Sequence, residues 1–190
     1  MASIVTETVR GRVRPRLLAA ALVLGSVPLG LAVVGCERNG PPMEGGIERV
    51  EIGGRTFDLE LAMTTESRTR GLGGRASVPE DGGMLFVFPD ADHRSFWMYD
   101  CLTAIDIAFV DPIGYVTAIH TMPTEPPRGE NESDVAYRRR LPGYSSRYPA
   151  QFVVELAPGM FETLGIKEGD RLSIPPERLK TLAAAAEPDL

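Results

Sequence analysis

Glycine and proline recur along the chain at short intervals and divide it into segments too short for long helices. The 190 residues include 20 Gly and 16 Pro. Glycine has no Cβ and adopts positive as readily as negative φ angles, and proline lacks a backbone N–H group, so both residue types tend to interrupt regular structure. About seven short apolar segments lie between these turn signals, and several alternate apolar with polar residues as half-buried strands do. The spacing therefore predicts a mainly β protein.

Two β-hairpins are predicted from the turn sequences. The segments on either side of Gly53-Gly54 alternate apolar with charged residues, as in Val50 and Ile52. A two-residue glycine loop favours a hairpin, because glycine readily adopts the positive φ angles that such turns need. A second hairpin is predicted between 105–110 and 115–122, around a turn that contains Pro and Gly.

The remaining elements are a buried strand, two further strands and short helices. Five consecutive apolar residues at 84–88 are too few for a typical helix and predict a strand buried on both faces. The segments 151–156 and 171–174 are also predicted to be strands. Short helices are expected after Thr64 and within 158–165. Together these elements predict a small antiparallel barrel or sandwich with two or three short helices.

The N-terminal segment, residues 1–35, has the pattern of a secretory signal. Four arginines precede an apolar run from Leu17 to Val34 that ends just before Cys36. The sequence Val33-Val34-Gly35-Cys36 resembles the bacterial lipobox, in which the cysteine is lipidated and becomes the mature N-terminus. The alternative is an uncleaved anchor, because 18 apolar residues are close to the minimum for spanning a membrane. Both interpretations predict an exported protein held on the cell membrane or outer membrane, facing the periplasm or the exterior.

The rest of the chain is predicted to form one domain with a flanking segment at each end. Residues 36–46 are rich in Gly, Pro and charge and predict a flexible tether. The β-rich domain is expected at 47–176. Residues 177–190 carry a single weak apolar stripe, which predicts a peripheral tail. Within the domain, the long segment 123–149 is expected to be a functional loop or disordered.

Charge and motif content exclude several classes of function. The formal net charge is −6 and the sequence pI is about 5.0, which argues against a nucleic-acid partner. No glycine-rich phosphate loop leads from a strand into a helix, so nucleotide binding has no support. The two histidines, His93 and His120, lack the spacing of a metal motif. No metal and no cofactor is predicted.

The catalytic candidate is Cys101 with a histidine partner, His120 or His93. A thiolate beside an imidazole is a nucleophile, and such a pair would support a hydrolase of the cell envelope. The alternative is that Cys101 packs as a small apolar residue, as free cysteines commonly do.

Several motifs, taken in order, resemble the family known as domain of unknown function 192. The matching stretches are 70–72, 79–88, 96–98, 105–107, 144–150 and 165–170. The resemblance implies a small, mostly antiparallel β domain that is often exported and lipid-anchored, and it implies no known activity. The chain departs from the family pattern at Gly73-Gly74, where large apolar residues are usual, and at Tyr99-Asp100-Cys101, where Lys-Asn-Thr is usual.

The candidate ligand-binding residues combine an aromatic ring with carboxylates and are Trp97, Asp100, Asp106, Tyr144 and Ser145. An aromatic face beside a carboxylate can recognise a polar or cationic ligand. The structural alternative is that Trp97 caps the core and Asp106 accepts backbone hydrogen bonds. The leading hypothesis is a membrane-tethered lipoprotein that binds a small ligand or an envelope partner without catalysis. A Cys101 hydrolase and a purely structural envelope protein are the rival interpretations.

Overall fold

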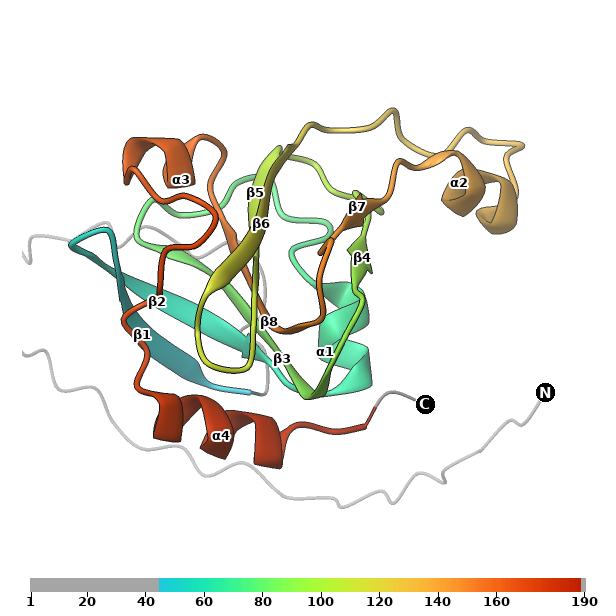
Figure 1. Cartoon of the computed structure of the whole chain (residues 1–190). Coiled ribbons are helices and arrows are strands. Elements are labelled where there is room, and N and C mark those ends of the chain that lie inside the picture. Colours follow the sequence, from blue (N-terminus) through green and yellow to red (C-terminus); the bar gives the residue numbers. More distant parts are fainter. Residues whose placement is uncertain (1–44, 189–190) are drawn as a thin grey trace, which may run out of the picture. The chain divides into compact units, whose positions relative to one another are not determined.

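The computed structural model describes residues 45–188 and shows a mainly β domain with four short helices (Figure 1). The predicted signal segment, the lipidation site at Cys36 and most of the tether lie outside the described residues. The large sheet contains, in spatial order, β1 (Ile47–Ile52), β2 (Arg55–Ala62), β3 (Gly82–Asp92), β8 (Ala150–Leu156), β5 (Ile105–Val110) and β6 (Val116–Met122). A second sheet pairs β4 (Ser95–Phe96) with β7 (Tyr144–Ser145).

Both predicted hairpins are present. β1 and β2 pair antiparallel, and Ile52 and Arg55 close the pairing around Gly53 and Gly54. These glycines have φ angles of 59° and 78°, as a tight hairpin turn requires. β5 and β6 form the second antiparallel pair.

The large sheet is mixed rather than wholly antiparallel, because β2 and β3 run parallel. A parallel pair needs a crossover connection, and here the chain passes through α1 (Thr65–Arg70) before it returns as β3. Thr64 caps α1 by accepting a hydrogen bond from the N–H of Ser67 at 3.0 Å. β1 and β6 stand at opposite ends of the strand order, so the described sheet does not close into a barrel and fits a sandwich-like architecture.

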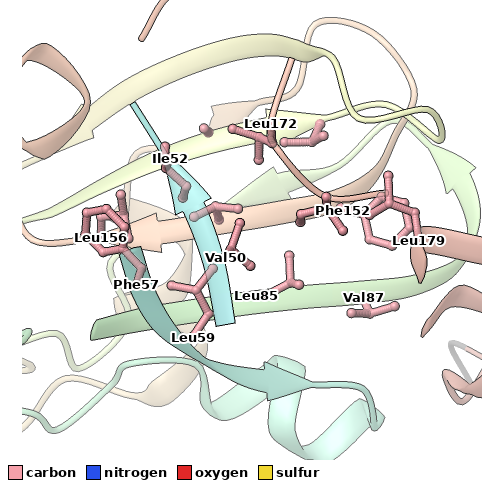
Figure 2. Close-up of a cluster of buried hydrophobic side chains, with 14 of the residues drawn as sticks. Val50, Ile52, Phe57, Leu59, Leu85, Val87, Phe152, Leu156, Leu172 and Leu179 are labelled. Carbon is pink, nitrogen blue, oxygen red and sulfur yellow. The ribbon is translucent and has the colours of Figure 1, made fainter. Parts of the chain in front are cut away.

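Hydrophobic cores cover both faces of the large sheet. In β3, Leu85 belongs to one core and Phe86 to the other, because successive side chains of a strand point to opposite faces. This confirms that 84–88 is a strand buried on both faces. Figure 2 shows the first core, whose labelled side chains are Val50, Ile52, Phe57, Leu59, Leu85, Val87, Phe152, Leu156, Leu172 and Leu179.

The C-terminal segment is part of this core, which corrects the prediction of a peripheral tail at 177–190. It forms α4 (Pro176–Ala185), which lies along the large sheet (Figure 1). Leu179 and Leu182 are buried in the first core. Two leucines about one turn apart are a weak sequence signal for a buried helix, but they are enough to anchor a helix that packs against a sheet.

Two other segments differ in detail from the expected elements. The predicted strand at 171–174 is reduced to one bridge between Arg171 and Tyr115. The segment 123–149 contains α2 (Asp134–Arg140) as well as β7, and Tyr137 of α2 is buried. The fourth helix is α3 (Met160–Thr163). No helix within the described range 45–188 is long and apolar enough to cross a membrane.

Candidate functional site

A pocket of about 990 Å³ lies between α1 and the segment that follows β3. One side is formed by α1 and the turn Gly71–Gly74, and the other by residues 93–101. The large sheet contributes Phe86, Phe88 and Glu155. The volume lies at the upper end of the range for small-molecule sites in proteins.

The glycine turn explains one departure from the family pattern. Gly74 donates a hydrogen bond from its N–H to the carbonyl of Asp100 at 2.8 Å. A Cβ on Gly73 would lie 3.0 Å from the carbonyl oxygen of Arg70 and 3.3 Å from that of Tyr99. Glycine therefore allows the turn to lie directly against the backbone of the opposite wall, a contact that a larger residue at position 73 would obstruct.

Two of the predicted ligand-binding residues, Trp97 and Asp100, line the pocket. Trp97 is 48% exposed, so its ring is not sealed in the core. Asp100 is exposed and has a φ of 52°, an uncommon conformation for a residue other than glycine. Its N–H donates a hydrogen bond to the phenol oxygen of Tyr137 at 3.2 Å, which fixes this part of the wall.

Three arginines of the pocket wall hold neighbouring groups of the protein. Arg68 donates hydrogen bonds to three backbone carbonyls at 2.8–3.1 Å. Arg94 donates to the carboxylate of Asp90 at 2.6 Å, and Arg138 to that of Asp134 at 2.8 Å. The guanidinium groups thus serve to fix the walls.

Glu155 lines the pocket as well, although it is not among the residues predicted from the sequence. It lies opposite Met84 in the strand pairing, and directly opposed residues share a face, so it points toward the second core. The residue is 5% exposed, and its Oε2 atom is buried without a hydrogen-bond partner. Burial raises the pKa of Glu155 to about 8, against the opposing charge of Arg75. The carboxyl is therefore mostly protonated at neutral pH.

Glu155 could have been recognised in the sequence as an acidic residue within an otherwise apolar predicted strand. The segment 151–156 is recognisable as a strand, and Glu155 has the same parity as Val153, which is buried in the second core. Arg75, the nearby cation, is engaged by Glu60 through hydrogen bonds of 2.6 and 2.8 Å. This bidentate pair leaves Glu155 beside an arginine whose two terminal nitrogens both donate to another carboxylate.

Cys101 lines the pocket, but the structure does not join it to an imidazole. Its Sγ donates a weak hydrogen bond to the carbonyl of Tyr99 at 3.6 Å. Burial and the negative charges of Glu155 and Asp100 raise the pKa of this thiol to about 12. At neutral pH the group is a thiol, which is a poor nucleophile.

The two histidines lie in different environments. The Nε2 atom of His120 is 2.9 Å from the carbonyl oxygen of Ser145, and its ring packs against Phe109 and Tyr144. His93 is exposed and lines the pocket. Within the part of the chain that the structure describes, no hydrogen bond connects either histidine to the cysteine.

Asp106 lies outside the pocket and serves the fold. It is 2% exposed, and its carboxylate accepts hydrogen bonds from the hydroxyl of Thr121 at 2.8 Å and the N–H of Phe161 at 3.2 Å. These bonds connect β5 to β6 and to α3. This arrangement matches the structural alternative rather than a ligand-binding role.

Tyr144 and Ser145 also lie outside the pocket, although they are close to it. In the small sheet Tyr144 pairs with Phe96 and Ser145 with Ser95, directly before Trp97 in the chain. They therefore support the pocket wall through β4. Among residues 45–188, no group of three or more His, Cys, Asp or Glu side chains could hold a metal ion.

Comparison with known proteins identifies the family and leaves the activity open. A crystal structure from Sinorhizobium meliloti 1021, provisionally described as a transcription regulator, is 31% identical, with a TM-score of 0.51; the match covers 67% of this chain and 90% of that one. A protein of unknown function from Novosphingobium aromaticivorans DSM 12444 is 27% identical, with a TM-score of 0.57; here the coverage is 70% and 90%. No curated protein matches the chain. The family profile DUF192, described as "Uncharacterized ACR", matches residues 48–174, and the chain therefore belongs to the domain of unknown function 192 family.

Proposed function

We propose that this protein is a membrane-tethered extracytoplasmic lipoprotein whose β domain binds a small ligand, without catalysis, in the pocket beside α1. The observation that carries the proposal is Glu155, a carboxyl that lines an open pocket at 5% exposure and whose buried Oε2 atom has no hydrogen-bond partner in the protein. Buried polar atoms in proteins are nearly always paired, and an exception needs an explanation. A ligand that donates a hydrogen bond supplies one.

The pocket also has the composition of a binding site. Apolar side chains of Phe86, Phe96 and Met98 share its lining with a few polar groups, and Trp97 offers an exposed ring. Binding sites for small molecules commonly combine an apolar lining with a small number of placed polar groups.

The proposal of a non-catalytic role follows from the chemistry of the candidate nucleophile. Cys101 has a pKa raised to about 12 and no imidazole partner among the described residues. The membrane tether is proposed from the apolar leader and the lipobox-like sequence before Cys36. The acidic net charge of −6 gives no support for extending a transcription regulator's role from the S. meliloti relative to this chain.

The binding proposal can be tested with the protein's own fluorescence, because Trp97 is the single tryptophan of the chain. A library of small polar and amphipathic molecules is titrated while Trp97 is excited at wavelengths that tyrosine does not absorb. We expect saturable changes in emission for a subset of compounds, and loss of their binding by calorimetry in Trp97→Ala. Tyr148→Ala, which removes an aromatic side chain that is 64% exposed and outside the pocket lining, is the matched control. Equal binding by wild type and Trp97→Ala would overturn the proposal.

The tether is tested separately in cells. Metabolic labelling with a fatty acid should mark the wild-type protein and leave Cys36→Ser unlabelled, with a shift of that variant out of the membrane fraction. Labelling that persists in Cys36→Ser would contradict lipidation at this residue.

A further inference from the structure

We propose that the ligand is an organic ammonium ion with an apolar body, and that its N–H groups bind the carboxylate of Glu155. This inference rests on the proposed function and specifies the ligand class of the same pocket. Three features support it: an acceptor without a partner, an aromatic lining, and three arginines that already donate to groups of the protein.

The first observation is that Glu155 has an acceptor without a donor. Oε2 is buried and has no hydrogen-bond partner, and the residue lines the pocket. Removing a carboxylate from water is costly unless a cation and its donors compensate for the loss of solvation. Arg75 is near, but both of its terminal nitrogens are held by Glu60 at 2.6 and 2.8 Å. A ligand ammonium would provide the charge and the donor together.

The second observation is the aromatic lining. Phe86, Phe96, Trp97 and Tyr99 all line the pocket, and the rings of Phe86 and Phe96 meet edge to face at 5.0 Å between centroids. Aromatic faces attract cations and also bury apolar groups. An amine attached to an apolar body would satisfy both properties, whereas a small inorganic cation would leave the apolar lining unused.

The third observation argues against an anionic ligand. Arg68, Arg94 and Arg138 line the pocket, but each donates to carbonyls or to a carboxylate of the protein. An anion would have to displace these hydrogen bonds. Arg70 has no ion pair within residues 45–188, but it is exposed to solvent and shares the lining with the carboxylates of Glu66 and Asp100. Glu66 and Asp100 are exposed carboxylates of the lining, whereas Oε2 of Glu155 is, among residues 45–188, the buried side-chain acceptor without a hydrogen-bond partner.

The charged and titratable groups around Glu155 define how binding should depend on pH. The charge of Arg75 acts on Glu155, and the charge of Glu155 acts in turn on Cys101. The other charged or titratable groups of the lining are Glu66, Arg68, Arg70, His93, Arg94, Tyr99, Asp100 and Arg138. In the free protein burial favours the protonated carboxyl, so an ammonium must displace this proton when it binds. Affinity should therefore increase as pH rises toward 8, by up to about tenfold per pH unit. A ligand that accepts a hydrogen bond from the protonated carboxyl would show the opposite dependence.

The experiment compares three probes of similar size: phenethylamine, 2-phenylethanol and 3-phenylpropanoate. Each is titrated into the wild-type protein with Trp97 emission as the readout, and calorimetry in buffers of different protonation enthalpy measures proton release. We expect the amine to bind at least about tenfold more tightly than the alcohol, more tightly still at higher pH, and with release of a proton. The same series in His93→Asn removes any contribution from that imidazole.

Glu155→Gln should abolish the preference for the amine over the alcohol. Glu168→Gln, which changes an acidic residue outside the pocket lining, should retain it. If Glu155→Gln does not fold, the pH dependence and proton release of the wild type decide the question. Binding of the alcohol or the carboxylate as tightly as the amine overturns the ammonium ligand and leaves the binding pocket standing. If no amine binds while other library compounds do, the ammonium ligand is likewise overturned and the binding pocket stands. If no compound binds at all, the proposed function itself is overturned.

Discussion

The phenol oxygen of Tyr137 accepts a hydrogen bond from the backbone N–H of Asp100 at 3.2 Å. Tyr137 belongs to α2, within the long segment 123–149, whereas Asp100 belongs to the pocket wall. A second bond runs from the phenol of Tyr99 to the carboxylate of Asp134 at 2.6 Å. The long segment therefore fixes one wall of the pocket.

Tyr137→Phe should weaken this wall. The substitution keeps the buried ring and removes the acceptor of Asp100, which should lower the free energy of unfolding by about 1 kcal/mol. The emission of Trp97 should also change, because it lies close to Asp100 in the chain. Urea denaturation and fluorescence spectra measure the two effects, with Tyr148→Phe as an exposed control. An unchanged stability and an unchanged spectrum would show that the bond does not hold the wall.

The buried carboxyl of Glu155 should make stability depend on pH. Its pKa is about 8 in the folded state against an ordinary value of 4.5, so between these values the folded protein binds one more proton than the unfolded chain. The free energy of unfolding should therefore fall by about 1.4 kcal/mol per pH unit as pH rises through this window. The stabilisation that Glu155 contributes is fully present below its ordinary pKa of 4.5 and is lost above its folded-state pKa of about 8.

Glu155→Gln should remove this dependence, because an amide does not titrate. The stability of the variant relative to wild type should improve steadily between about pH 5 and pH 8, as measured by denaturation at several pH values. A difference that stays constant over this range would show that Glu155 is already ionised in the folded protein.

Asp106→Ala should destabilise the fold without affecting the pocket. The substitution leaves the hydroxyl of Thr121 and the N–H of Phe161 without their acceptor, which should cost about 2–3 kcal/mol. Thr121→Val removes one donor and should cost less. Thermal denaturation measures both variants, and ligand affinity at a temperature where they remain folded should equal that of wild type. If Asp106→Ala lost ligand affinity while still folded, Asp106 would have a role in ligand binding.

Cys101 should react slowly with thiol reagents in the native protein. Because its pKa is raised to about 12, very little of the thiol is ionised at neutral pH. Iodoacetamide labelling followed by peptide mapping should show much faster reaction after unfolding. Asp100→Asn should accelerate native labelling, because one source of negative charge is removed. Rapid labelling of the native protein at neutral pH would support Cys101 as a nucleophile instead.

Local patterns in the sequence determined several elements and their turns. The glycines at 53 and 54 adopt the positive φ angles of the predicted hairpin, and the apolar run at 84–88 is a strand covered on both faces. Such features depend on steric and hydrogen-bonding preferences within a few residues, so a single sequence is enough to reveal them.

The arrangement of the site was decided by the tertiary structure. Parallel pairing of β2 with β3 joins segments separated by α1, and no local pattern distinguishes it from an antiparallel pair. The same holds for the roles of two acidic residues on buried strands: Asp106 finds donors in β6 and α3, whereas the Oε2 atom of Glu155 finds none. Sequence places both carboxyls on strands, but their roles depend on groups that distant segments bring within hydrogen-bonding reach.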